Sequence, residues 1–190
     1  MALVRIAVTG GPGAGKTTLW RTIAKAHRTR VVAVPEVATL LFSHVFPSVQ
    51  SPEERCAVQR AIFTVQHNLE QVHEGRLAPD QILWCDRGVP DGAGYWPHGQ
   101  EHFFETMQTA WQDELDRYAA VLFMESAAVG GLSIASANRT RSEDLRTATE
   151  LDARLRQVWQ AHPRFHHIPH ETDFVSKLTN ARKLAEALLR

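Results

Sequence analysis

The residues with the clearest chemical use lie near the amino terminus, where residues 10–17 read GGPGAGKT. This segment matches the pattern G-x-x-x-x-G-K-[ST] in full, with an apolar run before it and an amphipathic helical pattern after it. Glycines let successive backbone N–H groups turn toward an anion, and the first turn of the following helix adds its own unpaired N–H groups. The segment therefore predicts a site for the phosphates of ATP or GTP.

Each residue type within this loop has an expected role. Lys16 is expected to bridge the β- and γ-phosphates, and the Thr17 hydroxyl to coordinate Mg²⁺. A glycine-rich turn without a ligand is the alternative, and the strand, loop and helix context argues against it. The residues expected to contact the nucleotide are Gly11, Pro12, Gly13, Ala14, Gly15, Lys16, Thr17 and Thr18.

Two further acidic residues, Glu36 and Asp86, follow apolar runs. If those runs are parallel strands, both carboxylates lie at the same edge of the sheet as the phosphate loop. Glu36 is then a candidate base for the hydroxyl of an acceptor molecule, and Asp86 a candidate Mg²⁺ ligand beside Thr17. The alternatives are a solvated glutamate at a helix start and, for Asp86 with Arg87, a surface ion pair.

Arginines near these positions are suited to stabilise transferred charge. Arg87 directly follows Asp86, and its planar guanidinium fits a phosphate or acceptor oxygen. Arg139 and Arg141 stand one residue apart, and we expect them on a lid of about residues 126–146 that closes over the phosphates. The alternative for this stretch is a solvated charged loop.

Five short apolar runs alternate with helical patterns, which is typical of βαβ units around a mainly parallel sheet. We expect strands at residues 3–9, 30–35, 81–86, 119–125 and 165–169, and helices at residues 16–27, 52–74, 101–118, 146–161 and 173–189. The spacing of apolar residues in the last helix predicts that it is docked on the sheet. In the second helix, the same spacing predicts a sheet-facing side made of Ala57, Ala61, Ile62, Val65, Leu69 and Val72.

Two glycine-rich, irregular stretches directly follow expected strands, at residues 88–99 and 126–142. Ligands of open α/β sheets bind outside the carboxyl ends of the strands, so we expect function in these loops. In the first stretch, Asp91, Tyr95 and Trp96 either line an acceptor pocket or pack in the core.

Composition limits the class of protein. The chain has 190 residues with 44% hydrophobic content, which favours one domain over residues 1–190. Lys plus Arg and Asp plus Glu each number 21, so we expect no nucleic-acid polymer as a partner. The sequence has neither a signal-peptide pattern nor an apolar run of the ~20 residues that a membrane span needs, so we expect a cytoplasmic protein. Cys56 and Cys85 are expected to be reduced thiols. The oligomeric state is open, with a homodimer as one option.

With these segments together, the chain resembles the P-loop kinases of nucleosides and nucleotides. It resembles more closely a family of small ATP-binding proteins catalogued as an AAA-type domain. The segments that carry the resemblance are residues 8–18, 35–38, 85–88 and 139–144, followed by His162-Pro163.

The resemblance implies a three-layer α/β/α fold with a parallel five-stranded sheet of order 2-3-1-4-5. It also implies that Glu36 is the counterpart of the catalytic base of deoxynucleoside kinases. In the same way, Asp86 with Arg87 resembles their acid–arginine pair, and Arg139 with Arg141 resembles their lid. A eukaryotic branch of trafficking proteins, associated with GTP and acidic lipids, implies a different use of the same fold.

Two functions from different classes follow. The leading hypothesis is a kinase that transfers a phosphoryl group from ATP to a small molecule. Glu36 is the expected base, Lys16 with the lid arginines Arg139 and Arg141 stabilises transferred charge, and Thr17 with Asp86 holds Mg²⁺. The alternative is a regulatory ATP- or GTP-binding switch whose lid closure signals to a protein or lipid partner.

Overall fold

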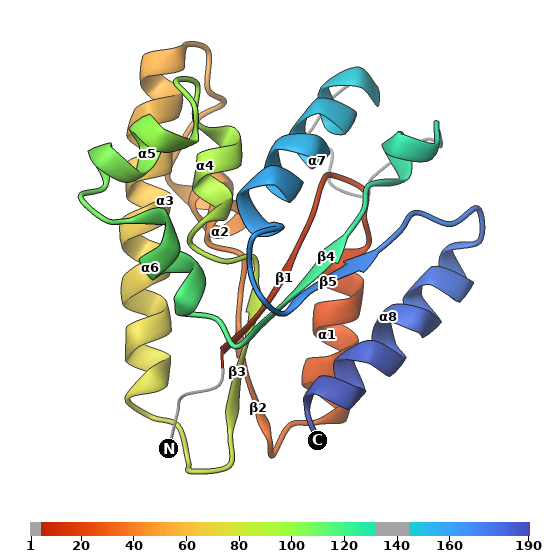
Figure 1. The fold of residues 1–190 in the computed structure, drawn as a ribbon. Coiled ribbons are helices and arrows are strands. Elements are labelled where there is room, and N and C mark those ends of the chain that lie inside the picture. Colours follow the sequence, from red (N-terminus) through yellow and green to blue (C-terminus); the bar gives the residue numbers. More distant parts are fainter. Residues whose placement is uncertain (1–4, 132–144) are drawn as a thin grey trace.

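A parallel five-stranded sheet forms the centre of the molecule in the computed structural model, which describes residues 5–131 and 145–190 (Figure 1). The strands are β1 (Arg5–Thr9), β2 (Val31–Val34), β3 (Ile82–Asp86), β4 (Ala120–Met124) and β5 (Phe165–Ile168). Their order is β2-β3-β1-β4-β5, and every neighbouring pair is parallel. The expected fold class and strand order are thus confirmed.

The register of the strands brings the candidate site residues to one edge. Val8 of β1 pairs with Asp86 of β3 on one side and with Leu122 of β4 on the other. Because parallel strands end at the same edge, the loops that follow β1, β2 and β3 meet there.

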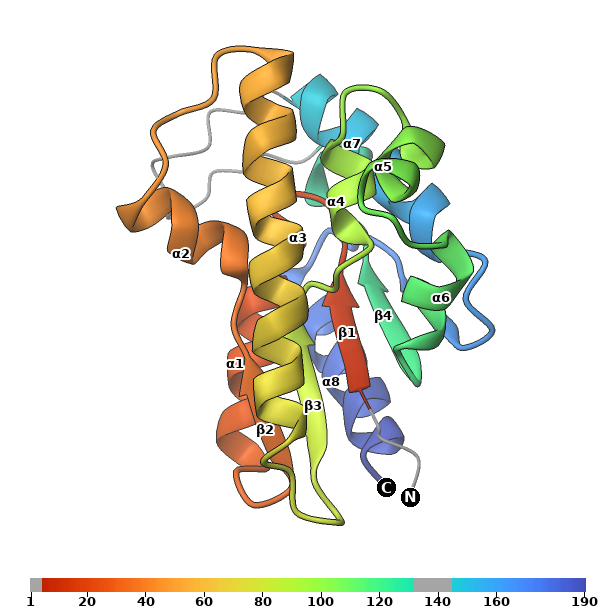
Figure 2. The ribbon, with the colours of Figure 1, turned by 90° about the vertical axis from the view of Figure 1, so that its left-hand side faces the viewer.

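Helices cover both faces of this sheet (Figure 1, Figure 2). The helices of the described residues are α1 (Lys16–Ala26), α2 (Val37–His44), α3 (Pro52–Glu74), α4 (Asp91–Tyr95), α5 (Gln100–Thr106), α6 (Trp111–Asp116), the 3₁₀ turn η1 (Ala127–Gly130), α7 (Leu145–Trp159) and α8 (Phe174–Leu188). Side chains alternate along a strand, so one core contains Ile6 and Val8 with α1 and α8. The other contains Ala7 with residues of α3 to α7.

The expected helix at residues 101–118 is wrong in detail, because two short helices, α5 and α6, replace it. Gln108 between them has a φ angle of 57° and Ala110 is extended, which ends the helical geometry. The stretch 88–99 also contains α4, whose Gly92 and Gly94 made it look irregular. A side chain on either glycine would collide with Phe103 or Leu155, so close packing determines this helix despite its low propensity.

Sequence reasoning did not predict α2. Val37 is its single buried residue, while Leu40 and Phe42 are 48% and 37% exposed. The helix therefore lacks the core-facing period by which an amphipathic helix is recognised.

The predicted inner face of α3 is wrong in part, since Leu69 does pack against the core but other predicted residues are exposed. Val65 and Val72 are 40% and 50% exposed, and the buried positions include Gln66 and Glu70. Glu70 is completely buried because it accepts hydrogen bonds from Gln66, Tyr118 and Arg117. Hydropathy alone predicts that such polar residues face solvent, whereas hydrogen bonds to distant side chains allow them to be buried in the core.

The remaining expectations about packing can be stated briefly. The docking of α8 is confirmed, since Ala181 and Ala185 are fully buried against the sheet. Cys56 and Cys85 are free thiols in the core. Among the described helices, none is long and apolar enough to cross a membrane.

Candidate active site

The phosphate loop lies between β1 and α1, and its glycines adopt conformations that other residues rarely take. The φ angles of Gly10, Gly13 and Gly15 are 129°, 69° and 90°. A Cβ atom on Gly10 would stand 1.9 Å from the Met124 carbonyl oxygen of β4, so no larger residue fits there. The sequence pattern and the packing thus require glycine for the same reason.

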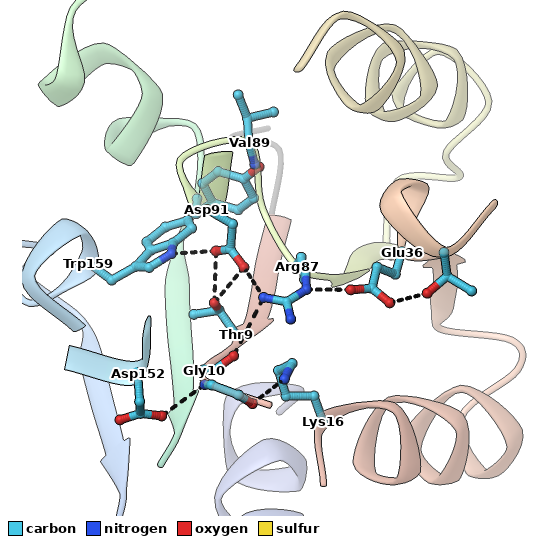
Figure 3. Close-up of polar contacts among 12 residues, drawn as sticks. Thr9, Gly10, Lys16, Glu36, Arg87, Val89, Asp91, Asp152 and Trp159 are labelled. Atoms are coloured by element: carbon cyan, nitrogen blue, oxygen red, sulfur yellow. Dashed lines mark hydrogen bonds and ion pairs between the residues drawn. The ribbon is translucent and has the colours of Figure 1, made fainter. Parts of the chain in front are cut away.

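Lys16 is the first residue of α1, and its side chain folds back over the loop (Figure 3). Its Nζ donates to the Gly11 carbonyl oxygen at 2.6 Å, and the residue is buried. Thr17 and Thr18 follow it on the solvent-exposed side of the first turn. The unpaired N–H groups of this turn and the Lys16 ammonium group together favour an anion.

Asp86 ends β3 beside the loop and is 2% exposed. Burial raises the pKa of its carboxyl group, and the nearby Glu36 carboxylate adds to this, while Lys16, Arg87 and a hydrogen bond from Thr17 act in the opposite direction. Within residues 5–131 and 145–190, no group donates a hydrogen bond to Asp86 Oδ1. A buried carboxylate oxygen without a partner, beside a threonine hydroxyl, fits the coordination of Mg²⁺.

Arg87 lies at the centre of a charged cluster (Figure 3). Its Nε donates to Glu36 Oε1 at 2.5 Å and its Nη1 donates to Asp91 Oδ2 at 2.7 Å, while the guanidinium carbon lies 5.5 Å from the centre of the Tyr95 ring. The second oxygen of Glu36 accepts a hydrogen bond from Thr39. Burial acts to lower the pKa of Arg87, but Tyr95, Glu36 and Asp91 outweigh it, so this pKa lies above its usual value.

The backbone of Arg87 has a φ angle of 76°, which is unusual for a residue with a side chain. Such a conformation costs about 1–3 kcal/mol and persists only where the surrounding contacts fix it. Here the Arg87 N–H donates to the Val8 carbonyl oxygen and the guanidinium group joins two carboxylates. The contacts therefore hold the arginine at this turn.

Asp91 joins three elements behind Arg87. Its Oδ1 accepts hydrogen bonds from the Thr9 hydroxyl at 2.7 Å and from Trp159 Nε1 at 2.6 Å. Thr9 ends β1 and Trp159 ends α7, so this one carboxylate fixes Arg87 relative to the phosphate strand and to the helix that follows residue 144. Sequence reasoning left its role open between pocket and core.

A cavity of about 430 Å³ opens between α2, α3 and α4, with the Glu36–Arg87 pair in its wall. Asp91 and Tyr95 also line it, whereas Trp96 is 3% exposed and packs in the core. Most of the wall is aromatic or aliphatic, contributed by Phe42, Phe46, Val58, Ile62, Phe63 and Tyr95. Polar side chains interrupt it at Arg55, Gln59 and Gln66.

Comparison with known proteins identifies the family. A family model described as an AAA domain matches residues 5–175. The chain belongs to this family.

Comparison with solved structures identifies a protein with a similar fold. The structure of deoxyadenosine kinase from M. mycoides with bound dATP matches this AAA domain with a TM-score of 0.64. The match covers 96% of this chain and 99% of that chain at 13% sequence identity, so it shows a shared P-loop kinase fold. No curated protein matches the sequence.

Sequence reasoning missed the cavity residues of this AAA domain that belong to no motif. Gln59, Ile62, Phe63 and Gln66 line the cavity at helical spacing along α3. That spacing was available in the sequence, but the exposed valines of the neighbouring face obscured it. Phe42 and Phe46 lie on or just after the unpredicted α2.

The structure brings Lys16, Thr17, Glu36, Asp86 and Arg87 together at one edge of the sheet. Arg139 and Arg141 lie outside the described residues, so their place on a lid stays a prediction. The described flanks of the expected lid are η1 and the start of α7.

Proposed function

We propose that this AAA domain is an ATP-dependent kinase that transfers the γ-phosphoryl group to a hydroxyl group of a small, nucleoside-like molecule. The observation that carries the proposal is the cavity, which opens at the Glu36–Arg87 pair beside the phosphate loop. Its volume and its largely apolar wall suit a small planar ligand. The bound dATP and the nucleoside substrate named for the kinase of similar fold support the same class of ligand.

The nucleotide side of the proposed reaction uses the contiguous loop. The N–H groups of residues 13–18 and the Lys16 ammonium group bind the phosphates, which requires Lys16 to exchange the Gly11 carbonyl for a phosphate oxygen. Thr17 and Asp86 would hold Mg²⁺, which neutralises phosphate charge when it is bound. The free oxygen of Asp86 supports this assignment.

On the acceptor side, Glu36 accepts the proton of the acceptor hydroxyl as that oxygen bonds to the γ-phosphorus. The bond from the γ-phosphorus to the departing ADP oxygen breaks in the same displacement. The hydrogen bonds from Arg87 and Thr39 orient the Glu36 carboxylate, which suits a base that must face the acceptor hydroxyl. Arg87 fixes Glu36, and we assign charge stabilisation on the γ-phosphoryl group to Lys16, Arg87, Arg139 and Arg141.

The test is acceptor-stimulated turnover of ATP by the purified protein, measured with a panel of nucleosides, nucleotides and other small hydroxyl compounds. A kinase consumes ATP much faster with one acceptor and yields the phosphorylated acceptor and ADP in equal amounts. We expect this chain to be a cytoplasmic enzyme that prefers ATP to GTP. The same assay with GTP in place of ATP tests that preference.

The regulatory alternative gives a different result in this assay. A switch hydrolyses its nucleotide slowly with every small molecule in the panel, and a protein or lipid partner changes that rate instead. Phosphorylated acceptor among the products, identified by mass spectrometry, decides in favour of the kinase.

A further inference from the structure

Two side chains from distant segments hold one side of the phosphate loop. This side, which we call the outer side, packs against α8 and the residues that follow β4. The Ser126 hydroxyl, just after β4, donates to the Pro12 carbonyl oxygen at 2.5 Å. The Lys177 ammonium group, on α8, donates to the Ala14 carbonyl oxygen at 3.0 Å. These carbonyl groups belong to the loop that is proposed to bind phosphates, but neither contact uses a phosphate-binding group.

The planarity of the peptide bond gives these contacts a consequence. Among the described residues no peptide bond is cis, so the C=O and the N–H of each peptide unit point in opposite directions. A hydrogen bond that holds the Ala14 carbonyl on the outer side therefore turns the Gly15 N–H toward the inner side. By the same argument, the Ser126 contact with Pro12 turns the Gly13 N–H inward.

Lys177 is well fixed for this task. It is 3% exposed, and its Nζ also donates to the Glu125 carbonyl oxygen at 2.5 Å. The start of α8 is held by Asp173, whose side chain accepts hydrogen bonds from the N–H groups of Val175 and Ser176. The Phe174 ring lies against Gly15, so α8 covers the outside of the loop at this point.

The charges around Lys177 explain why a cation is needed there. Asp152 accepts hydrogen bonds from the N–H groups of Gly11 and Ser126, which places a buried carboxylate next to an anion site. Burial lowers the pKa of Lys177, while Asp152, Glu125 and then Glu171 oppose that change. A protonated Lys177 offsets the negative charge that Asp152 and Glu125 would otherwise present to a phosphate.

We propose that Lys177 is a positioning residue of the nucleotide site, which orients the Gly15 N–H toward the phosphates and neutralises the carboxylates behind the loop. The inference rests on the proposed function, because it assumes that the loop binds a nucleotide. It assigns part of the affinity for phosphate to a residue that lies outside the G-x-x-x-x-G-K-[ST] pattern and more than 150 positions from it.

The experiment compares Lys177→Met with Lys183→Met, a matched change at an exposed position of the same helix. Calorimetry measures the affinity of each folded variant for Mg-ATP and for inorganic tripolyphosphate. Loss of one charge-assisted hydrogen bond predicts about 10- to 100-fold weaker binding of both ligands to Lys177→Met. Lys183→Met should bind both ligands as the parent does.

Thermal unfolding of the same samples separates positioning from a structural role. A purely structural Lys177 would lower the melting temperature while the folded variant kept the parent's affinity, and that result overturns the inference. Should Lys177→Met fail to fold, Lys177→Gln takes its place, with a loss of affinity for both ligands again expected and an unchanged affinity overturning the inference. Failure of the parent itself to bind Mg-ATP or tripolyphosphate would instead reject the proposed function, and the inference with it.

Discussion

The phosphate loop and the proposed acceptor side of the site are neighbours at one edge of the sheet, but different kinds of chemical group form them. The loop is one contiguous segment whose working groups are backbone N–H groups, with Lys16 as its charged side chain. The proposed acceptor side joins the side chains of Glu36, Arg87 and Asp91, of which the last two are buried and which come from separate segments after β2 and β3. We therefore expect that a substitution in the loop weakens nucleotide binding without affecting acceptor binding, and that a substitution on the proposed acceptor side lowers turnover without affecting nucleotide binding.

The largest effect is expected for Glu36→Gln. Removal of a general base lowers kcat by about 10²- to 10⁴-fold, while the affinity for Mg-ATP stays close to the parent's, because we assign phosphate binding to the loop N–H groups and Lys16. Steady-state kinetics with the stimulating acceptor, together with calorimetry, measure the two quantities. Glu101→Gln, at an exposed position of α5, is the control. A parallel loss of nucleotide affinity would break the comparison.

The next effect concerns the stability of the acceptor side. Asp91→Ala leaves Arg87 with one carboxylate partner fewer and leaves Thr9 and Trp159 without their acceptor, so we expect a loss of about 3–5 kcal/mol in the free energy of unfolding. Chemical denaturation measures it. Asp113→Ala, which changes an exposed residue of α6, should have little effect. A small loss for Asp91→Ala would mean that the charged cluster is not what holds Arg87.

For the loop, Lys16→Ala is expected to weaken the binding of Mg-ATP by about 10- to 100-fold, which corresponds to one hydrogen bond to a charged group. Binding of the acceptor alone should persist, since the cavity walls are unchanged. Calorimetric titration of each ligand checks both statements, with Lys25→Ala at the exposed end of α1 as the matched control. Equal affinity for Mg-ATP in Lys16→Ala and in the parent would contradict the assignment of the loop.

Asp86→Asn concerns both regions, because Asp86 interacts with Lys16 of the loop and with Glu36 of the proposed acceptor side. Burial and the Glu36 carboxylate raise the pKa of Asp86, so its ionised form at neutral pH opposes folding. The variant should therefore gain about 0.5–2 kcal/mol in the free energy of unfolding without ligand, the usual size of a stabilising substitution. It should also lose the Mg²⁺ dependence of nucleotide binding. A variant that is less stable than the parent would show that the carboxylate has a structural role.

The smallest effect is a change in acid stability on the loop side. Burial raises the pKa of Glu125, but hydrogen bonds from the His170 backbone and side chain, and then His167, outweigh it, so the pKa lies below its usual value. Such a group contributes stability that is present above the usual pKa of a glutamate and is lost as pH falls through the lowered one. Glu125→Gln should reduce the fall in unfolding free energy at acidic pH by less than about 1 kcal/mol, since solvent screens the partly exposed pair of Glu125 and His170. Unfolding free energies measured at successive acidic pH values test this, and an unchanged profile would contradict it.

The two halves of the site also differ in how far the sequence predicted them. Residues 10–17 were recognised because a phosphate loop depends on backbone conformation and on adjacent residues, which a local pattern records. Glu36, Asp86 and Arg87 were placed by a rule about strand ends. By contrast, Gln59, Gln66 and Phe42 of the cavity follow no motif, and α2 lacks the periodic pattern that reveals an amphipathic helix.

The sequence by itself determined the strands and the loop at which phosphates are expected to bind. It could do so because short apolar runs, glycine positions and the Lys-Thr pair are local properties of the chain. The strand order came from the resemblance to a known family. Only the tertiary structure decided which face of α3 is buried, that Asp91 fixes Arg87, and that Lys177 supports the loop from α8. Burial of a charged or polar side chain depends on partners that lie far away in the chain. Such partners become visible when folding brings them within hydrogen-bonding distance.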